Sequence, residues 1–545
     1  MTTNTDDTIC AISTPAGVGG IAVARISGPK AIEIVASVWQ GKDLMQCPGH
    51  TAHLGLIVDP ASPSAPLDQA VATIFRSPAS FTGEDVVELS VHGSTFIQSQ
   101  LINLLIRQGA RMAEPGEFTR RAFAAGKMDL AEAEAVADVI ASTSAASHRV
   151  AMTQMRGKYS TALNDLRDKL IEIASLIELE LDFSEEDVEF ADRSRLADLT
   201  RLTLDTVKQL AQTFSTGNAI KNGIPVAIIG KPNAGKSSIL NLLVGDDRAI
   251  VSDIPGTTRD TIEDTATIGG VTYRFIDTAG LRTTTDAIEN LGIDRAWQKA
   301  SQASLVIWVI DASTAPTPTP STASTPSAAP LPSTSSTSCI VPLPTSSSSS
   351  RTVPLPTIDE LSDFYTRLTT ILSPNTPILI LLNKSDLATP STLSALTTAL
   401  TTALTTSIGS PLTTSIASNP YRILPFSALD GDLSLLTDAI VSLCGICSAT
   451  LSPDAVIVTN SRHYQALQQS IAPLERVLAS LSPASTTSFP SSTPNTPLSA
   501  ISFNLPLDLV AQDLREAIHH LSTITGSITT PDLLSTIFSR FCIGK

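Results

Sequence analysis

The segment that most constrains the fold of this chain is Gly-Lys-Pro-Asn-Ala-Gly-Lys-Ser at 230–237, which has the spacing of a phosphate-binding loop. A short apolar run, Pro225–Ile229, precedes it and reads as a strand, and an apolar helical run, Ile239–Leu243, follows it. In a strand, glycine-rich turn and helix of this order, backbone N–H groups can face phosphate oxygens. The segment therefore predicts a nucleotide-binding α/β domain.

Apolar strands recur downstream at 273–276, 305–310 and 378–382, with helical stretches between them. This alternation predicts βαβ units around a mainly parallel sheet. Asp277-Thr-Ala-Gly280 follows the first of these strands, and Asn383-Lys384-Ser-Asp386 follows the third. Short motifs in this order, each at a strand end, indicate one site rather than a set of chance loops.

The Asn383-Lys384-x-Asp386 motif predicts which nucleobase the site selects. The Asp386 carboxylate offers two acceptors to the N–H donors on the pairing edge of guanine. Adenine has an acceptor at that edge and would leave the carboxylate without a partner in a desolvated pocket. We therefore expect GTP as the nucleotide, with Ser427-Ala428 completing the base site after a further strand.

The terminal phosphates and Mg²⁺ need a lysine, hydroxyls and an acid. We expect Lys236 to reach the terminal phosphates and the hydroxyls of Ser237 and Thr258 to bind Mg²⁺. Asp277 would hold the ion through a water molecule, and the Gly280 N–H would contact the γ-phosphate as a switch.

Leu281 follows the switch glycine, where Ras-like GTPases carry the glutamine that positions the attacking water. Leucine cannot orient water, so another group must do so. Glu289 and Asp286 are the nearest carboxylates in the following segment. The residues alone leave open whether either acid is catalytic or simply solvated.

Segment 312–357 contains 38 Ser, Thr, Ala or Pro residues among its 46. It has too little large apolar surface to offset the entropy of ordering, so we predict a disordered insertion. The insertion explains why Asp277 and Asn383 are 106 residues apart, far more than a βαβ unit requires. Segment 389–419 favours a weak helix and segment 482–502 favours a loop.

Helical patterns flank the nucleotide-binding region. Asp129, with Glu132 three residues later, predicts a capping box at a helix start. Leucines and isoleucines from Leu163 to Leu181 recur at spacings of three and four, which is typical of a helix with one apolar stripe. Helical character returns at 462–481 and 507–521. We expect four regions: an α+β unit at 1–125, a helical domain in two parts at 126–222 and 451–545, and an inserted GTPase domain at 223–450.

The composition limits the partners. The 545 residues include 36 Lys+Arg and 52 Asp+Glu, a net charge of −16, which argues against nucleic-acid binding through bulk positive charge. The apolar runs are far shorter than the roughly 20 residues of a membrane-spanning helix, and the first residues lack a targeting pattern. We therefore expect a cytoplasmic protein with no membrane partner. Six cysteines do not make a disulfide framework, and Cys444-x-x-Cys447 lacks the second pair that zinc needs.

Several motifs resemble those of a known family. Gly230–Ser238, Asp253–Asp260 and Asp277–Arg282 resemble the TrmE-Era-like GTPases. The flanking sequences are similar to the MnmE (TrmE) family of tRNA-modification GTPases, at Phe81–Asp85 with Glu88 and His92-Gly93, Pro115–Thr119, Gly126–Leu130 and Phe541–Lys545. The resemblance implies a multidomain α/β protein with an α+β folate-binding N-terminal domain that dimerises, a discontinuous helical domain and an inserted P-loop GTPase domain with a parallel-type sheet.

The resemblance also implies a reaction. Members of this family act with the FAD-containing MnmG (GidA) protein, in a heterotetramer or larger complex. They install an aminomethyl or carboxymethylaminomethyl group at carbon 5 of the tRNA wobble uridine. The implied one-carbon donor is 5-formyl- or 5,10-methylene-tetrahydrofolate. By the same resemblance, K⁺ and G-domain dimerisation replace an arginine finger, and Glu289 orients the attacking water.

The resemblance assigns residues to each ligand. The GTP-binding set comprises Asn233, Ala234, Gly235, Lys236, Ser237, Ser238, Ser252, Thr257, Thr258, Asp277, Gly280, Asn383, Lys384, Asp386, Ser427 and Ala428. The K⁺ ligands would be Asn233, Ser252, Ile254 and Thr257, and the folate contacts would be Arg25, Glu88, Lys127 and Lys545. Cys542 matches a C-terminal cysteine of the family.

Two other functions fit parts of the pattern. A regulatory or ribosome-assembly GTPase would share the G domain alone, and it would need an RNA-binding appendage such as a KH clamp, which is not evident. A folate-dependent aminomethyltransferase with an accessory G domain would bind folate without a GTP-dependent change in modification. Without the resemblance, Arg25 and Lys127 would read as surface charges and Cys542 as a core residue. Ser94 also departs from the glycine that relatives often carry.

Overall fold

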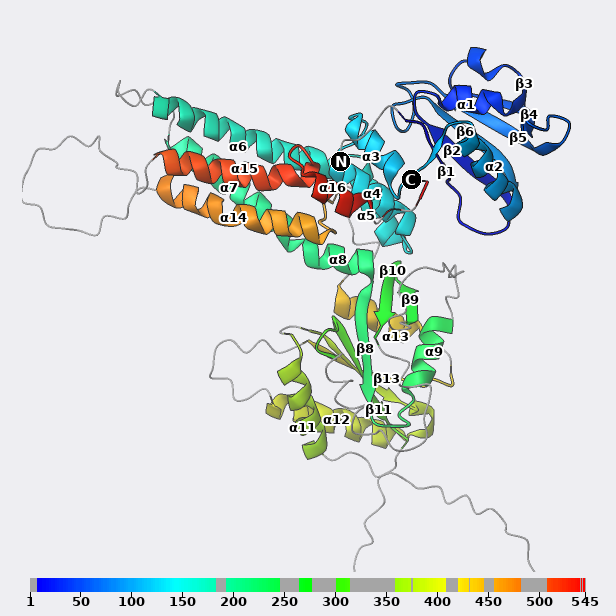
Figure 1. Cartoon of the computed structure of the whole chain (residues 1–545). Helices are drawn as coiled ribbons and strands as arrows, with labels where there is room; N and C mark the ends of the chain where they lie inside the picture. Colours follow the sequence, from blue (N-terminus) through cyan, green and yellow to red (C-terminus); the bar gives the residue numbers. More distant parts are fainter. Residues whose placement is uncertain are drawn as a thin grey trace, which may run out of the picture. The chain divides into compact units, whose positions relative to one another are not determined.

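The chain forms two compact units in the computed structural model (Figure 1). The structure describes residues 7–182, 193–245, 264–276, 300–313, 358–373, 376–407, 420–430, 432–445, 455–481, 507–539, 541 and 543–544. The first unit is built from residues 1–221 and 452–545, and the second from residues 222–451. The second unit is thus inserted into the sequence of the first.

A seven-stranded sheet organises the start of the first unit, with the strand order β3-β4-β5-β6-β2-β1-β7. Its neighbours pair antiparallel except β1 and β7, which are parallel. The strands are β1 (Ile9–Ile12), β2 (Gly19–Ser27), β3 (Trp39–Gly41), β4 (Thr51–Val58), β5 (Pro66–Phe75), β6 (Val86–Gly93) and β7 (Arg111–Met112). The helices of this part are α1 (Ala31–Ser37), the single turn η1 (Leu44–Gln46), α2 (Thr95–Arg107) and α3 (Glu117–Ala124).

The two faces of this sheet differ because successive side chains of a strand point to opposite sides. On one face, alternate residues such as Ala24, Ile26 and Leu89 are buried with residues of α1 and α2. On the other face, β2 carries Ile21, which is 69% exposed, and β4 carries Leu54, which is 65% exposed. This second face is therefore only partly covered within the part of the chain that the structure describes.

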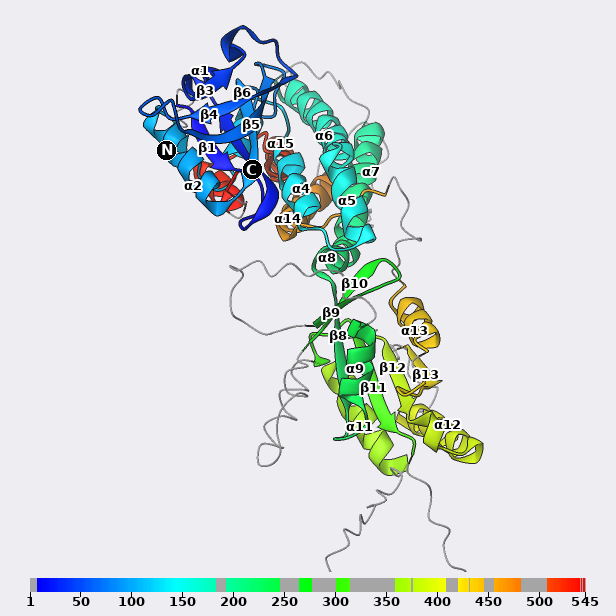
Figure 2. The same ribbon diagram turned by 90° about the vertical axis from the view of Figure 1, so that its right-hand side faces the viewer.

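A helical bundle makes up the rest of the first unit (Figure 2). Its helices are α4 (Leu130–Ala141), α5 (Ala145–Met155), α6 (Lys158–Asp182), α7 (Arg193–Gln212), α8 (Phe214–Asn222), α14 (Ser461–Leu481), α15 (Leu507–Thr525) and α16 (Pro531–Phe538). Apolar stripes from α6, α7, α14 and α15 share one buried core, so the helical segments on both sides of the insertion fold together.

Two details test the helix predictions. Asp129 and Glu132 form the predicted capping box at the start of α4, where the Asp129 carboxylate accepts from the Glu132 N–H at 2.8 Å. The stripe of α6 is buried from Leu163 to Ile177, as predicted. Leu181, the last position of the predicted stripe, also lies within α6 and is 38% exposed, one residue from the end of the helix.

The second unit contains a six-stranded sheet in the order β13-β12-β11-β8-β10-β9. All of its pairs are parallel except β10 and β9, a hairpin at one edge. The strands are β8 (Ile224–Gly230), β9 (Asp264–Ile268), β10 (Val271–Phe275), β11 (Leu305–Asp311), β12 (Ile378–Asn383) and β13 (Tyr421–Pro425). The prediction of a mainly parallel sheet is confirmed.

Among the described residues of this unit, the helices are α9 (Lys236–Gly245), α11 (Ile358–Ile371), α12 (Pro390–Ser407) and α13 (Ser434–Cys444), with the single turn η3 (Ser385–Leu387). Residues of α11 and α12 share a buried core with one face of β8, β11 and β12. The predicted weak helix in 389–419 corresponds to α12, whose leucines Leu396, Leu400 and Leu404 are buried. Segment 482–502, nearly all of 312–357 and Cys447 lie outside the described residues.

No described helix combines the length and the apolar composition that crossing a bilayer requires.

Candidate functional site

The phosphate loop connects β8 to α9, as the sequence predicts. Gly230 has φ +154, and a Cβ added there would collide with the carbonyl oxygen of Val309 on β11. Gly235 has φ +93, and a Cβ there would overlap Nδ2 of Asn383. Neighbouring groups approach both positions so closely that only glycine fits there. Because these residues have no side chains, the backbone N–H groups of the loop remain accessible to a phosphate.

Lys236 lies at the start of α9, with its side chain turned back over the loop. Its Nζ donates to the carbonyl oxygens of Gly230 at 2.8 Å and Lys231 at 2.7 Å. Burial lowers the pKa of Lys236 from its usual value. A phosphate anion would favour the protonated form again, so the ammonium is in a suitable place to pair with the terminal phosphates.

The guanine motif begins at the last residue of β12, Asn383, which is 1% exposed. Its Nδ2 donates to the carbonyl oxygen of Ala234 in the phosphate loop at 2.7 Å. Its Oδ1 is buried and has no hydrogen-bond partner among the described residues. Asn383 thus joins the two motifs that the sequence assigned to opposite ends of one nucleotide.

Asp386 lies in η3, next to the segment that follows β13. The Ser427 hydroxyl donates to Asp386 Oδ1 at 2.7 Å, and the Ser385 N–H donates to the Phe426 carbonyl at 3.1 Å. These two bonds hold the carboxylate against the Ser427-Ala428 turn. The arrangement brings together the two segments that we expected to read the base.

Lys384 adopts the left-handed conformation, with φ +61. Its Nζ pairs with Asp311 Oδ2, at the end of β11, at 2.5 Å. Burial by itself would raise the pKa of Asp311, but Lys384 and the hydroxyl of Ser313 lower it. The sequence did not point to Asp311, because nothing in its local pattern distinguishes it from another acid at a strand end.

A second cluster of predicted residues lies on the sheet of the first unit. Arg25 on β2 and Glu88 on β6 face each other in the strand register and form an ion pair at 2.7 Å. The Arg25 guanidinium also lies 5.3 Å from the ring centroid of Phe81 and 5.7 Å from that of Phe118. Lys127 is exposed, and its Cε lies 3.4 Å from the position that a Cβ on Gly83 would take. Arg25 and Lys127 therefore border the segment 81–85, and Glu88 is joined to that segment through Arg25.

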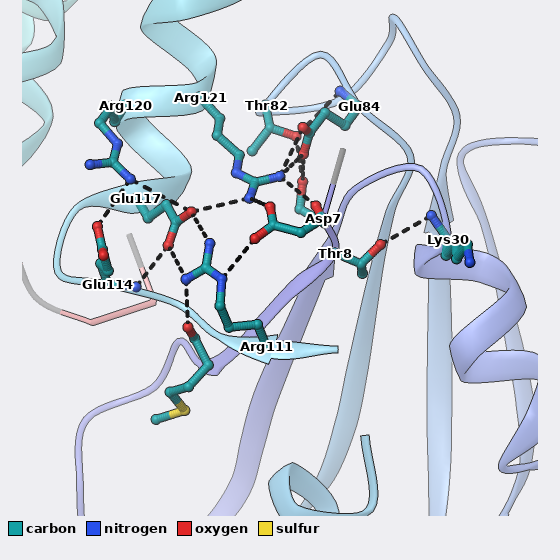
Figure 3. A network of polar contacts seen from close by, with 12 residues as sticks. Asp7, Thr8, Lys30, Thr82, Glu84, Arg111, Glu114, Glu117, Arg120 and Arg121 are labelled. Carbon is teal, nitrogen blue, oxygen red and sulfur yellow. Dashed lines mark hydrogen bonds and ion pairs between the residues drawn. The ribbon is translucent and has the colours of Figure 1, made fainter. Parts of the chain in front are cut away.

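A partly buried ionic network, centred on the buried side chains of Glu117 and Arg121, holds α3 beside this cluster (Figure 3). The Glu117 carboxylate, 2% exposed, accepts from Arg111 at 2.7 Å and from Arg121 at 3.1 Å. Arg121 also donates to Asp7 at 2.6 Å and to Glu84 at 3.0 Å. Burial by itself would raise the pKa of Glu117, but the arginines and the Glu114 N–H lower it. The network fixes Phe118, the neighbour of Glu117, against the segment 81–85.

Sequence reasoning missed this network because its members come from four separated segments. Local sequence patterns indicate where helices and strands form, but they do not show that Asp7 and Arg121, far apart in the sequence, are in contact in the fold. The available signal was the presence of Glu84 and Glu117 within the motifs that carried the family resemblance.

Besides Cys447, these residues singled out from the sequence lie outside the described residues: Ser252, Ile254, Thr257, Thr258, Asp277, Gly280, Leu281, Asp286, Glu289, Cys542 and Lys545. Ser237, the other residue predicted to bind Mg²⁺, lies in the first turn of α9, and Asn233 lies in the loop with φ +61. In the described ranges, no three His, Cys, Asp or Glu residues are grouped to hold a metal ion.

Comparison with known sequences shows to which family the chain belongs. Residues 8–127 match the family described as "GTP-binding protein TrmE N-terminus", and residues 130–542 match the "MnmE helical domain". The curated tRNA modification GTPase MnmE of Christiangramia forsetii is 42% identical over 99% of both chains. The protein of that name from Cytophaga hutchinsonii is 41% identical over 100% of this chain and 99% of its own.

The chain belongs to the MnmE family. A tRNA modification GTPase MnmE from Parabacteroides distasonis, 41% identical over 99% of this chain and all of its own length, agrees with this assignment. The predicted GTPase class and the multidomain α/β fold class are confirmed.

Proposed function

We propose that this MnmE-family protein hydrolyses GTP and couples that hydrolysis to modification of carbon 5 of the tRNA wobble uridine. The product would be a carboxymethylaminomethyl or aminomethyl group. The observation that carries the proposal is the hydrogen bond from Asn383 to Ala234, which unites a guanine-reading motif with a phosphate loop in a chain that matches MnmE proteins along nearly its whole length.

The nucleotide site supports a division of roles. Ser427 holds Asp386 so that its carboxylate can accept from the N–H groups of guanine. Lys236 would pair with the terminal phosphates, and the backbone of Asn233–Ser238 would surround them. Mg²⁺, held by the hydroxyls of Ser237 and Thr258, would screen phosphate charge during transfer. Asp277 and Gly280 would respond to the γ-phosphate.

Hydrolysis also needs an oriented water and a second positive charge. We assign Glu289 to the water and K⁺ to the charge, with Asn233, Ser252, Ile254 and Thr257 as ligands. The left-handed backbone of Asn233 supports this assignment, because it orients a side chain in an exposed part of the loop. A cation beside the phosphates would offset the negative charge that develops during transfer.

The cluster around Arg25 supports a site for tetrahydrofolate, as the 5-formyl or 5,10-methylene form. It combines aromatic rings, a carboxylate and two cations, which suits a ligand with a flat ring system and an anionic tail. Because Arg25 is already paired with Glu88, the exposed Lys127 is the accessible cation for the tail. Lys545 would complete the site from the C-terminus, and Cys542 matches the C-terminal cysteine of the family.

Homodimerisation is the third part of the proposal. The partly covered face of the N-terminal sheet, with Ile21 and Leu54 exposed, supports a second copy as its partner. The net charge of −16 favours an assembly in which an FAD-dependent MnmG-type partner supplies much of the tRNA contact, in a heterotetramer or larger complex.

The decisive experiment is nucleoside analysis of tRNA from a strain that lacks this protein, with re-expression of the wild-type chain as the control. We expect unmodified carbon 5 at wobble uridines, restored by re-expression. Normal wobble uridines, together with altered ribosome assembly, would instead favour a regulatory GTPase.

A further inference from the structure

The C-terminal tail, which runs from Phe538 at the end of α16 to the last residues, is packed against the N-terminal part of the first unit rather than left free. Phe538 is 2% exposed and Phe541 is 8% exposed, and their ring centroids lie 5.5 Å apart. Phe538 also contacts Phe123 of α3, at a centroid distance of 6.4 Å. A chain end usually frays, so this packing calls for a specific attachment.

The first point of attachment is Gly116, the residue before α3. It has φ +67, and a Cβ there would come within 3.0 Å of Phe541 Cβ and 3.1 Å of Phe538 Cβ. A side chain at position 116 would therefore push the tail away. The glycine allows the two phenylalanines to lie directly on the backbone at the start of α3.

The second point of attachment is a hydrogen bond between residues 531 positions apart. The Ser13 hydroxyl donates to the carbonyl oxygen of Gly544 at 3.1 Å. Gly544 has φ +98, and a Cβ there would lie 3.0 Å from the Ile12 carbonyl carbon and from Ser13 Cα. The tail backbone thus lies on the backbone that follows β1, at a distance that only glycine permits.

Ser13 is held firmly enough to fix the tail. It follows β1 directly, and its N–H donates to the Val23 carbonyl of β2 at 2.7 Å. In the same pair of strands, Ala11 is opposite Arg25, and Arg25 is opposite Glu88 on β6. Ser13, which contacts Gly544, therefore comes two residues after Ala11, the residue of β1 that is opposite Arg25.

We propose that Ser13 is a positioning residue that holds the C-terminal tail on β1, so that the last residues are kept near the Arg25–Glu88 pair. Its hydroxyl provides the polar contact, and Gly116 and Gly544 provide the space. The consequence for tRNA modification rests on the proposed function, but the docking of the tail does not.

The test compares full-length Ser13→Ala, Ser13→Thr and Ser37→Ala with the wild type. Ser37 is the matched control, because its hydroxyl donates to the Ile34 carbonyl at 2.7 Å within the same domain and does not contact the tail. Tail release is measured as the rate of maleimide alkylation of Cys542, followed by peptide mass spectrometry, and as removal of C-terminal residues by carboxypeptidase.

We expect Ser13→Ala to accelerate both reactions about fivefold. Loss of one ordinary hydrogen bond should raise the population of the released tail by about this factor, and both reactions act on the released tail. Ser13→Thr should restore the wild-type rates, because it keeps the hydroxyl, and Ser37→Ala should equal the wild type. Wild-type rates in Ser13→Ala would overturn the proposal.

The catalytic readouts separate this inference from the proposed function. GTP hydrolysis should be unchanged in Ser13→Ala, whereas modification of tRNA by the variant with its partner should slow. A released tail with unchanged modification would confirm the positioning role of Ser13 and contradict the proposed part of the tail in the reaction.

Discussion

Asn383 Nδ2 donates a hydrogen bond to the carbonyl oxygen of Ala234 across 149 residues of sequence, at 2.7 Å. The donor is the last residue of β12, and the acceptor lies in the phosphate loop after β8. These strands are not neighbours, since β11 lies between them. A single side chain therefore connects the segment predicted to read the base with the predicted phosphate loop, at the carboxyl edge of the sheet.

Replacing Asn383 with Ala should weaken GTP binding about tenfold. The Ala234 carbonyl would lose its buried partner, at a cost of about 1–3 kcal/mol, and the loop would lose its contact with β12. Isothermal titration calorimetry with GTP would measure the effect. Thr397→Ala, which removes only a bond to Leu393 within α12, should bind as the wild type does. Equal affinity in both variants would show that the bond does not shape the site.

Asp386→Asn should lower GTP affinity about 100-fold, because an amide replaces one acceptor of the guanine N–H groups with a donor. Xanthosine triphosphate carries a carbonyl in place of the guanine amino group, so the variant should gain affinity for it. Competition binding with GTP and xanthosine triphosphate measures this change in nucleotide preference. Ser427→Ala removes the 2.7 Å bond that orients Asp386 and should have a smaller effect of about fivefold. Unchanged GTP affinity in Asp386→Asn would show that this residue does not read the base.

GTP hydrolysis should be at least about tenfold faster in K⁺ than in Na⁺, because a K⁺-sized ion at Asn233 would provide the charge that an arginine finger provides elsewhere. Steady-state phosphate release in matched chloride salts measures the ratio, and Asn233→Ala should abolish the difference. Equal wild-type rates in the two salts would refute the role of potassium.

Glu289→Ala should slow hydrolysis about 100-fold and leave GTP affinity near that of the wild type, since a water-orienting group acts mainly in the transition state. Single-turnover hydrolysis and nucleotide binding, measured on the same preparation, test this expectation. Asp286→Ala is the matched control and should hydrolyse GTP at the wild-type rate. A parallel loss of nucleotide affinity would assign Glu289 a structural role.

Features encoded within one short stretch could be predicted from the sequence. The capping box at Asp129 and strands β8, β11 and β12 follow from local spacing and apolar runs. The motifs of the proposed nucleotide site could also be recognised, because each of them is contiguous in the sequence. In contrast, β9 escaped prediction, since its five residues contain two polar threonines and an aspartate at the edge of the sheet.

Contacts between distant segments could not be predicted. Asp311 with Lys384, Ser13 with Gly544 and Asp7 with Arg121 each join parts of the chain that no periodicity connects. They depend on strand order and on how α3 and α16 pack, and these are properties of the assembled fold. The residues proposed to bind folate were assigned from the resemblance alone, and only the structure shows the aromatic contacts of Arg25.

The first unit contains a buried histidine, His463, on α14. Because this side chain titrates, we expect the local stability of α14 to depend on pH. His463 on α14 is 1% exposed, and its Nε2 lies 2.6 Å from Glu134 and 2.9 Å from Arg462. Its Nδ1 is buried and has no partner among the described residues. Burial lowers the pKa of His463, although Glu134 acts in the opposite direction. An imidazolium would bury an unpaired Nδ1–H and would add a positive charge next to the Arg462 guanidinium at Nε2, so we expect a neutral ring.

The sign of the effect follows from the lowered pKa. Below pH 6.5 the unfolded chain binds a proton at His463 that the folded chain does not bind, so stability should fall as the pH falls, by at most about 1.4 kcal/mol per unit. Hydrogen exchange of α14 amides at pH 7.5 and 5.5, corrected for intrinsic rates, gives the opening free energies. His463→Gln should flatten this dependence, whereas His148→Gln, at an exposed site, should keep it. If His463→Gln showed the wild-type dependence, another group would be responsible, and His520, whose pKa is also lowered by burial, would be the next residue to substitute.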